Sequence, residues 1–238
     1  MSVSTANSFY WKGFRDGAPF VLVSGPFGML FGVLATEAGL NLVETMTLTA
    51  TVFAGAAQFT ALQLMQVDTP TVIVLASALA VNLRMAMYSA SLTPYLGAAP
   101  LWQRALAAYL MVDQAYACSI VRFETEPDLT VPQRIGYYFG VVTPVATMWY
   151  VCTLLGALLG ARIPESMALD FALPIAFLGM VTPMMRTTAH LAAAGVSVIV
   201  ALLAAGLPYN LGLIVAGLAG MMTGARVELA LRRKGRWI

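Results

Sequence analysis

Residues 71–93 read TVIVLASALAVNLRMAMYSASLT, and this stretch decides the fold class. It is long and apolar enough to cross a bilayer, because about 20 apolar residues span the hydrocarbon core. Asn82 and Arg84 nevertheless lie near its centre, and Tyr88 follows them. An arginine at that depth is disfavoured by about 2.5–3.5 kcal/mol on insertion scales, so a simple anchor would not carry one. The stretch therefore predicts a central membrane helix whose Arg84 faces protein or water.

The composition extends this conclusion to the whole chain. Of 238 residues, 60% are hydrophobic and only 10% are charged, whereas soluble domains are about 25% charged. The sequence therefore predicts an all-α, polytopic membrane helix bundle with about eight transmembrane helices. The expected helices cover residues 17–36, 45–66, 71–93, 101–121, 136–160, 171–184, 188–206 and 209–225.

The distribution of basic residues predicts the orientation. Cytoplasmic loops carry an excess of Lys and Arg. If both termini are cytoplasmic and every expected helix crosses, Arg104 and Arg162 are the two basic residues outside, and Arg84 lies within the membrane. The other ten of the 13 lie inside, which favours an even number of crossings, about six to eight. We expect residues 1–16 to form a cytoplasmic arm, residues 17–228 a single transmembrane domain, and residues 229–238 a basic cytoplasmic tail held at lipid headgroups.

Proline and glycine residues inside the expected helices predict helix breaks. Pro26, Pro144 and Pro174 each remove a backbone hydrogen bond, and Gly28 lies close to the first of them. Freed backbone groups at such positions can bind a ligand where they line a cavity. Proline is also frequent in membrane helices without any such role.

Arg84 and Asp113 are the charged residues that the expected helices place within the membrane. Arg84 is either a site for an anionic group, such as a substrate carboxylate, or a fixed partner of Asp113 or of exposed helix carbonyls. Asp113 is either a proton-coupling carboxyl group or one half of a permanent salt bridge. The two interpretations are compatible if a substrate competes with Asp113 for Arg84.

A second set of polar residues falls in the expected helix 45–66. Thr51, Gly55 and Gln58 are spaced four and three residues apart, which places them on one helical face. They are candidates for hydrogen bonding to a substrate, and polar packing between helices explains them nearly as well.

The sequence lacks the motifs of several other function classes. It has one histidine, two separate cysteines (Cys118 and Cys152), and no C-x-x-C or H-E-x-x-H pattern, so we expect no metal site. No phosphate-binding or dinucleotide-binding glycine motif occurs. We therefore expect no cofactor, no enzymatic activity and no nucleic-acid partner.

Several motifs resemble the AzlC family of branched-chain amino-acid permeases. The resemblance rests on Pro26-Phe27-Gly28-x-x-Phe31-Gly32, Val52-Phe53-Ala54-Gly55-Ala56-Ala57-Gln58-Phe59, Val81-Asn82-Leu83-Arg84-Met85-x-x-Tyr88-x-x-Ser91-Leu92, Asp113, Asp170-Phe171-Ala172-Leu173-Pro174 and Leu207-Pro208-x-Asn210-x-Gly212. Met85 and Ala57 depart from the family pattern, which has histidine and serine at these positions.

The resemblance implies a multi-pass transporter of the bacterial inner membrane that exports valine, leucine and isoleucine. It also implies a small AzlD-type membrane subunit as partner. Arg84 would bind the substrate carboxylate, and Asp113 would bind the ammonium group or carry a coupled proton, with Asn82, Gln58, Gly55 and Tyr88 as further substrate contacts. A passive channel for small polar solutes, with Arg84 as its selectivity filter, is the alternative. The sequence does not decide whether the chain forms a homo-oligomer.

Overall fold

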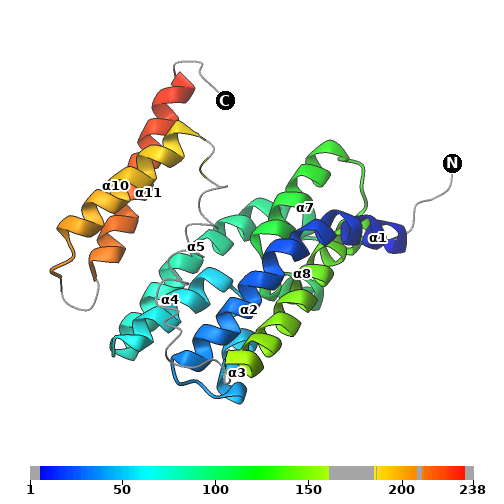
Figure 1. Ribbon diagram of the computed structural model, residues 1–238. Coiled ribbons are helices and arrows are strands. Elements are labelled where there is room, and N and C mark those ends of the chain that lie inside the picture. The colour runs from blue at the N-terminus through cyan, green and yellow to red at the C-terminus, as the bar shows by residue number, and fades with distance from the viewer. Residues whose placement is uncertain (1–5, 161–184, 186, 208–210, 234–238) are drawn as a thin grey trace. The chain divides into compact units, whose positions relative to one another are not determined.

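The computed structural model describes residues 6–160, 185, 187–207 and 211–233, and these are helical with short connections (Figure 1). The predicted all-α class is confirmed. Within these ranges, four helices are long and apolar enough to cross a membrane: Ala6–Glu37, Thr71–Leu96, Val131–Gly160 and Leu211–Leu231. The chain forms two compact units, one of Met1–Asp68 with Val74–Leu169 and the other of Thr69–Ile73 with Asp170–Ile238. Each unit is described by itself.

The first helical segment of the larger unit starts before the predicted residue 17. α1 covers Ala6–Gly17, a 3-10 turn covers Ala18–Phe20, and α2 covers Val21–Glu37. Phe9 is 3% exposed within α1, so burial of one face orders residues that were expected to form an arm. Burial of apolar surface against a neighbouring helix commonly decides whether a polar segment is helical.

The helices do not break at the prolines. α2 stays helical through Pro26, and α8, which covers Val131–Gly160, stays helical through Pro144. This corrects the breaks predicted at Pro26, Gly28 and Pro144. Pro174 lies outside the described residues.

The α1–α2 segment packs along α8 with both running in the same direction. Gly136 of α8 lies against Ala6, and Gly160 at its other end lies against Val33. When two helices run in the same direction, the chain between them must return from the end of the first helix to the opposite end, where the second helix begins. The chain between α2 and α8 therefore crosses the unit an odd number of times.

Glycine allows the backbones of these parallel helices to touch. A methyl group on Gly13 would collide with the carbonyl oxygen of Tyr137, and one on Gly140 would collide with the carbonyl oxygen of Tyr10. Tyr137 precedes Gly140 by three residues, and Tyr10 precedes Gly13 by three residues, so the contact between the two helices is reciprocal. Such small-residue interfaces drive helix association in membranes through close packing.

The predicted helix 45–66 is interrupted. α3 covers Leu42–Thr51 and α4 covers Gly55–Gln66. α3 starts three residues early because the Asn41 side chain accepts a hydrogen bond from the Glu44 backbone, and the Glu44 side chain accepts one from the Asn41 backbone. Ala54 precedes α4 in an extended conformation and provides no side-chain cap.

The predicted helix 101–121 is interrupted as well. α6 covers Leu101–Tyr109 and α7 covers Asp113–Thr125, with Val112 extended between them. Asp113 is therefore the first residue of a helix rather than a mid-helix residue. A carboxylate is favourable there, because the N-terminal end of a helix carries a partial positive charge.

α5 (Thr71–Leu96) and α7 run parallel to each other. Contacts advance along both helices together: Arg84 with Asp113, Tyr88 with Tyr116, and Tyr95 with Phe123. Only a short linker separates the end of α5 from α6, so α6 must run in the opposite direction. α6 and α7 thus form a hairpin that enters the unit and returns to the same end.

α3 and α4 form a second hairpin from the other end. α3 starts shortly after the end of α2, and Thr49 near its C-terminus reaches Trp149 in the middle of α8. α4 starts with Gly55 against the same Trp149 ring, and its Leu64 packs with Val74 near the start of α5. The continuous helices predicted at 45–66 and 101–121 are therefore both wrong. Each is a pair of half-length helices, and α5 is the single full-length helix between them.

The hairpin arrangement also reassigns one basic residue. At one end of the unit lie the start of α1, the α5–α6 linker and the α7–α8 connection, and Figure 1 shows α1 and α7 at this end and α3 at the other. This basic end gathers Lys12, Arg15, Arg104, Arg122 and Arg134. Within residues 6–160, the opposite end carries Glu37, Glu44 and Asp68 without Lys or Arg. Arg104 thus joins the other basic residues, and the positive-inside rule predicts that this end is cytoplasmic.

The hairpins predict a specific sidedness of labelling. In a background lacking Cys118 and Cys152, Ala98→Cys in the α5–α6 linker should react with a membrane-impermeant maleimide only from the cytoplasmic side. Val67→Cys, between α4 and α5, should react only from the outside. Both side chains are exposed. Labelling of intact cells and of inverted vesicles measures the side from which each cysteine reacts. Reaction of residue 67 from the cytoplasmic side and of residue 98 from the outside would show that both segments cross the membrane fully.

The smaller unit contains an antiparallel pair, α10 (Thr188–Leu203) and α11 (Leu211–Arg233). Ser197 Oγ donates a hydrogen bond to the Ala216 carbonyl over 3.2 Å. α11 continues beyond the predicted residue 225, so the first part of the predicted basic tail is helical. The predicted helix 171–184 lies outside the described residues.

Candidate functional site

The ion pair between Arg84 and Asp113 is the centre of the candidate site. Arg84 Nη1 lies 3.1 Å from Asp113 Oδ2, and the two side chains are 24% and 31% exposed. Arg84 comes from the middle of α5, and Asp113 starts α7 at the tip of the α6–α7 hairpin. The pairing that the sequence suggested is confirmed, and it lies at mid-height in the unit.

Aromatic residues form one side of this site. The rings of Tyr88 and Tyr116 stack with centroids 4.1 Å apart and planes 8° apart. The Tyr88 hydroxyl group interacts with the Asp113 carboxylate, and the Tyr116 hydroxyl lies 3.2 Å from Ser91 Oγ. Tyr88 was a predicted site residue, whereas Tyr116 was not. Tyr116 follows Asp113 by three residues, and this helical spacing could have identified it as a site residue.

The ion pair leaves hydrogen-bonding capacity unused. Arg84 Nε and Asp113 Oδ1 are buried atoms without a hydrogen-bond partner among the residues that the structure describes. Buried polar atoms normally have partners, because an unpaired one costs about 1–3 kcal/mol. One donor from a cation and one acceptor from an anion thus remain available at the same place.

Gln58 and Gly55 lie at the α3–α4 break. Gln58 is fully buried, and its side-chain amide donates hydrogen bonds to the Val52 carbonyl and, over 3.1 Å, to Thr49 Oγ1. Trp149 Nε1 donates to the same Thr49 oxygen over 2.9 Å, and the Trp149 ring covers Gly55. These contacts hold the break together, and none of them joins Gln58 or Gly55 to the ion pair.

The tips of the two hairpins touch each other. The Tyr109 hydroxyl at the end of α6 donates a hydrogen bond of 2.5 Å to the Ala50 carbonyl in the last turn of α3. The Phe53 ring lies 6.1 Å from the Tyr109 ring and stacks on Tyr150 at 5.4 Å. Asp113 therefore lies just past the point where the two hairpins meet.

Asn82 is half-buried on α5, two residues before Arg84, which places it on nearly the opposite face of the helix. Arg84, Tyr88 and Ser91 are spaced four and three residues apart and share the face toward α7. Asn82 therefore faces away from the ion pair.

Removal of the Gln58 amide should destabilise the fold. Gln58→Leu keeps a similar volume but leaves the Val52 carbonyl and the Trp149–Thr49 pair without their bridging donor. We expect the free energy of unfolding to fall by about 1–3 kcal/mol, measured by thermal or denaturant unfolding in detergent. Gln63→Leu, on the exposed side of the same helix, is the matched control. Equal stability of the two variants would contradict the bridging role.

Within the described ranges, no three His, Cys, Asp or Glu side chains gather closely enough to hold a metal ion.

Comparison with known proteins places this arrangement in a family. The model of the family described as "AzlC protein" matches residues 19–163, which span α2 to α8 and include the ion pair. A relative from Archaeoglobus fulgidus, named "Uncharacterized membrane protein", is 28% identical over 184 residues, covering 76% of this chain and 78% of the relative. No solved structure matches the chain. Because the family match covers more than half of the sequence, including both hairpins and the Arg84–Asp113 pair, this membrane protein belongs to the AzlC family.

Proposed function

We propose that this chain is a secondary transporter that exports branched-chain or similar apolar amino acids across the bacterial inner membrane. Membership of the AzlC family supports a role in membrane transport. The observation that carries the proposal is the Arg84–Asp113 pair, which joins the middle of an apolar helix to the tip of a hairpin. Ionisable groups at such depth mark substrate or ion pathways in membrane proteins.

The chemistry of the pair suits a zwitterion. The guanidinium group binds a carboxylate with a planar fork of donors, and its Nε is the donor left unpartnered. The Asp113 carboxylate binds an ammonium group, and its Oδ1 is the acceptor left unpartnered. An amino acid that inserts between the two side chains replaces their mutual interaction with two interactions of the same kind.

The surroundings suit an apolar side chain. The stacked Tyr88 and Tyr116 rings lie beside the pair, and α5 is apolar on both sides of Arg84. An aliphatic side chain against aromatic faces is stabilised by removal of apolar surface from water, about 25 cal/mol per Å².

Asp113 also offers a route to proton coupling. In the proposal, its carboxylate holds the substrate ammonium in the loaded state and a proton in the return state. Exchange of the two at one carboxylate links export to proton entry, and the half-helix hairpins move to expose the site to each side in turn. A small AzlD-type membrane subunit is the proposed partner of this movement.

Counterflow in proteoliposomes tests this function. Vesicles loaded with unlabelled leucine should take up radiolabelled leucine faster than empty vesicles, because a carrier returns faster when loaded. A pH gradient should drive net movement, and the assay is run with and without the small subunit. Glycine and glutamate are the control solutes. Uptake without acceleration by internal leucine would indicate a passive channel instead.

A further inference from the structure

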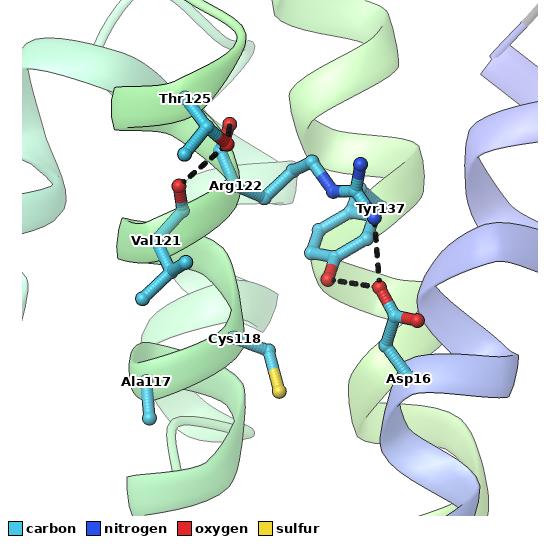
Figure 2. A pocket seen from close by; sticks show the side chains of 7 residues that line it. All are labelled: Asp16, Ala117, Cys118, Val121, Arg122, Thr125 and Tyr137. Atoms are coloured by element: carbon cyan, nitrogen blue, oxygen red, sulfur yellow. Dashed lines mark hydrogen bonds and ion pairs between the residues drawn. The ribbon is translucent and has the colours of Figure 1, made fainter.

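A cavity that is largely open to the outside lies between α1, α7 and α8, and Figure 2 shows the residues that line it. It lies apart from the Arg84–Asp113 site, toward the basic end of the unit. Its volume is about 360 Å³, within the range of about 300–1,000 Å³ that is typical of small-molecule sites. The end of the unit that gathers the basic residues is the predicted cytoplasmic end. For an exporter, substrate would enter from this side.

The cavity carries charges of both signs, which pair between α1 and α7. Asp16 Oδ2 accepts a hydrogen bond of 3.0 Å from Arg122 Nη2 and one of 2.6 Å from the Tyr137 hydroxyl. Arg122 Nη1 pairs with Glu126 at 2.5 Å. The Arg122 and Asp16 side chains are 27% and 39% exposed, so both remain within reach of a solute.

The α7 side of the cavity carries three apolar side chains in addition to Arg122 and Thr125. Ala117, Cys118 and Val121 line it, and Figure 2 shows the Cys118 sulfur between α7 and Asp16. The cavity is therefore lined by an acid from α1, by the Tyr137 hydroxyl from α8, and by a base and short apolar side chains from α7. This is the complement of a zwitterion with an aliphatic side chain.

α7 connects the cavity to the ion pair. Ala117 and Val121 follow Asp113 by four and eight residues, which places all three on one face of the helix. Arg122 lies nine residues after Asp113, which is a rise of about 13 Å and a rotation of about 180° around the helix, so the two charged groups leave α7 on opposite faces. One helix thus carries an acid–base pair at each end, Arg84–Asp113 at mid-height and Asp16–Arg122 at the cytoplasmic end.

We propose that this cavity is a second amino-acid subsite, at which a branched-chain amino acid docks from the cytoplasm before it reaches the Arg84–Asp113 pair. Arg122 binds the carboxylate, Asp16 binds the ammonium group, and Ala117, Cys118 and Val121 contact the side chain. This inference rests on the proposed function for its substrate class.

Cys118 provides a reporter inside the subsite. The experiment uses the Cys152→Ala variant, so that Cys118 is its remaining cysteine. Intact mass spectrometry in detergent measures the rate at which N-ethylmaleimide alkylates Cys118. We expect leucine at ten times its Kd to slow alkylation by about tenfold, because the free fraction falls as 1/(1 + [leucine]/Kd). The protection should be absent with 4-methylpentanoate, which lacks the ammonium group, and with 3-methylbutylamine, which lacks the carboxylate. Failure of leucine to protect would overturn the subsite, and so would equal protection by the two analogues.

Variants locate the protection. Asp16→Asn and Arg122→Gln should abolish it, whereas Glu126→Gln should retain it, because Glu126 pairs with Arg122 without lining the cavity. Arg84→Gln should also retain it. Protection that survives Asp16→Asn but disappears in Arg84→Gln would overturn the subsite, since leucine would then act from the other pair. Leucine transport by the unmodified chain is measured separately: transport without protection refutes the subsite alone, and protection without transport refutes the exporter alone.

Discussion

Arg84→Gln is expected to lower leucine counterflow by at least ~30-fold at equal amounts of protein in the membrane. The substitution removes the guanidinium fork and leaves Asp113 without its partner at 3.1 Å. Loss of one partner of a fully buried charged pair costs about 2–5 kcal/mol, and the lower end of this range applies to a pair that is 24% and 31% exposed. Each 1.4 kcal/mol corresponds to a factor of about ten. Arg84→Lys should lose most activity as well, because an ammonium group is a point charge without the planar fork. Proteoliposome counterflow measures both variants.

Two controls separate substrate binding from structure. Arg104→Gln removes an exposed arginine from α6 and should leave counterflow unchanged. The double variant Arg84→Gln/Asp113→Asn removes both charges, so that neither charge is left without its partner. If the pair only holds α5 to α7, the double variant should recover transport. We expect it to fold and to remain inactive, and full transport by Arg84→Gln itself would refute the site.

Gly140→Leu is expected to abolish the folded state. A Cβ atom at this position would collide with the Tyr10 carbonyl and crowd the Phe14 backbone nitrogen at 2.9 Å. Neither obstacle is a flexible side chain, so the α1–α2 segment would have to separate from α8 along its length. Overpacking of even a few methylene groups costs about 1–3 kcal/mol, and the loss of this interface adds to that. The fraction of monodisperse protein after extraction in detergent, measured by size-exclusion chromatography, reports the result.

The matched control for this prediction is Gly217→Leu. Gly217 lies on the exposed side of α11, and a Cβ atom added there meets nothing within 4 Å. The same substitution should therefore be tolerated. A monodisperse Gly140→Leu protein that equals the Gly217→Leu protein in yield would show that the parallel contact does not hold the unit together.

The polar pattern of α5 was enough to predict half of the candidate site. Arg84, Tyr88 and Ser91 recur at helical spacing, and their common face does contact α7. The partner of Arg84 followed from electrostatics, because Asp113 is the carboxylate that the expected helices left in the membrane. Gln58 differs, because its role depends on the break between α3 and α4, which its own sequence neighbourhood does not reveal.

The hairpins could not be predicted from hydropathy. A half-helix, a bend and a second half-helix have the same length and apolar content as one full crossing. The bends at Val52–Ala54 and Leu110–Val112 contain no proline, whereas Pro26 and Pro144 lie in helices that continue through them. What fixes the bends is long-range: Gln58 with Thr49, Tyr109 with Ala50, and Arg84 with Asp113. The direction of α7 relative to α5 is visible only from such contacts.

The parallel contact between α1–α2 and α8 has a consequence for biosynthesis. The first segment ends at Glu37 and α8 begins at Val131. The ribosome adds roughly 5–20 residues per second. The glycine face of the first segment must therefore wait roughly 5–20 s in the membrane before its partner emerges from the translocon. During that interval the first segment has only lipid or an insertion chaperone to cover Gly13. A nascent chain arrested before residue 131 should therefore crosslink through residue 13 to the insertion machinery, and one arrested well after residue 160 should not.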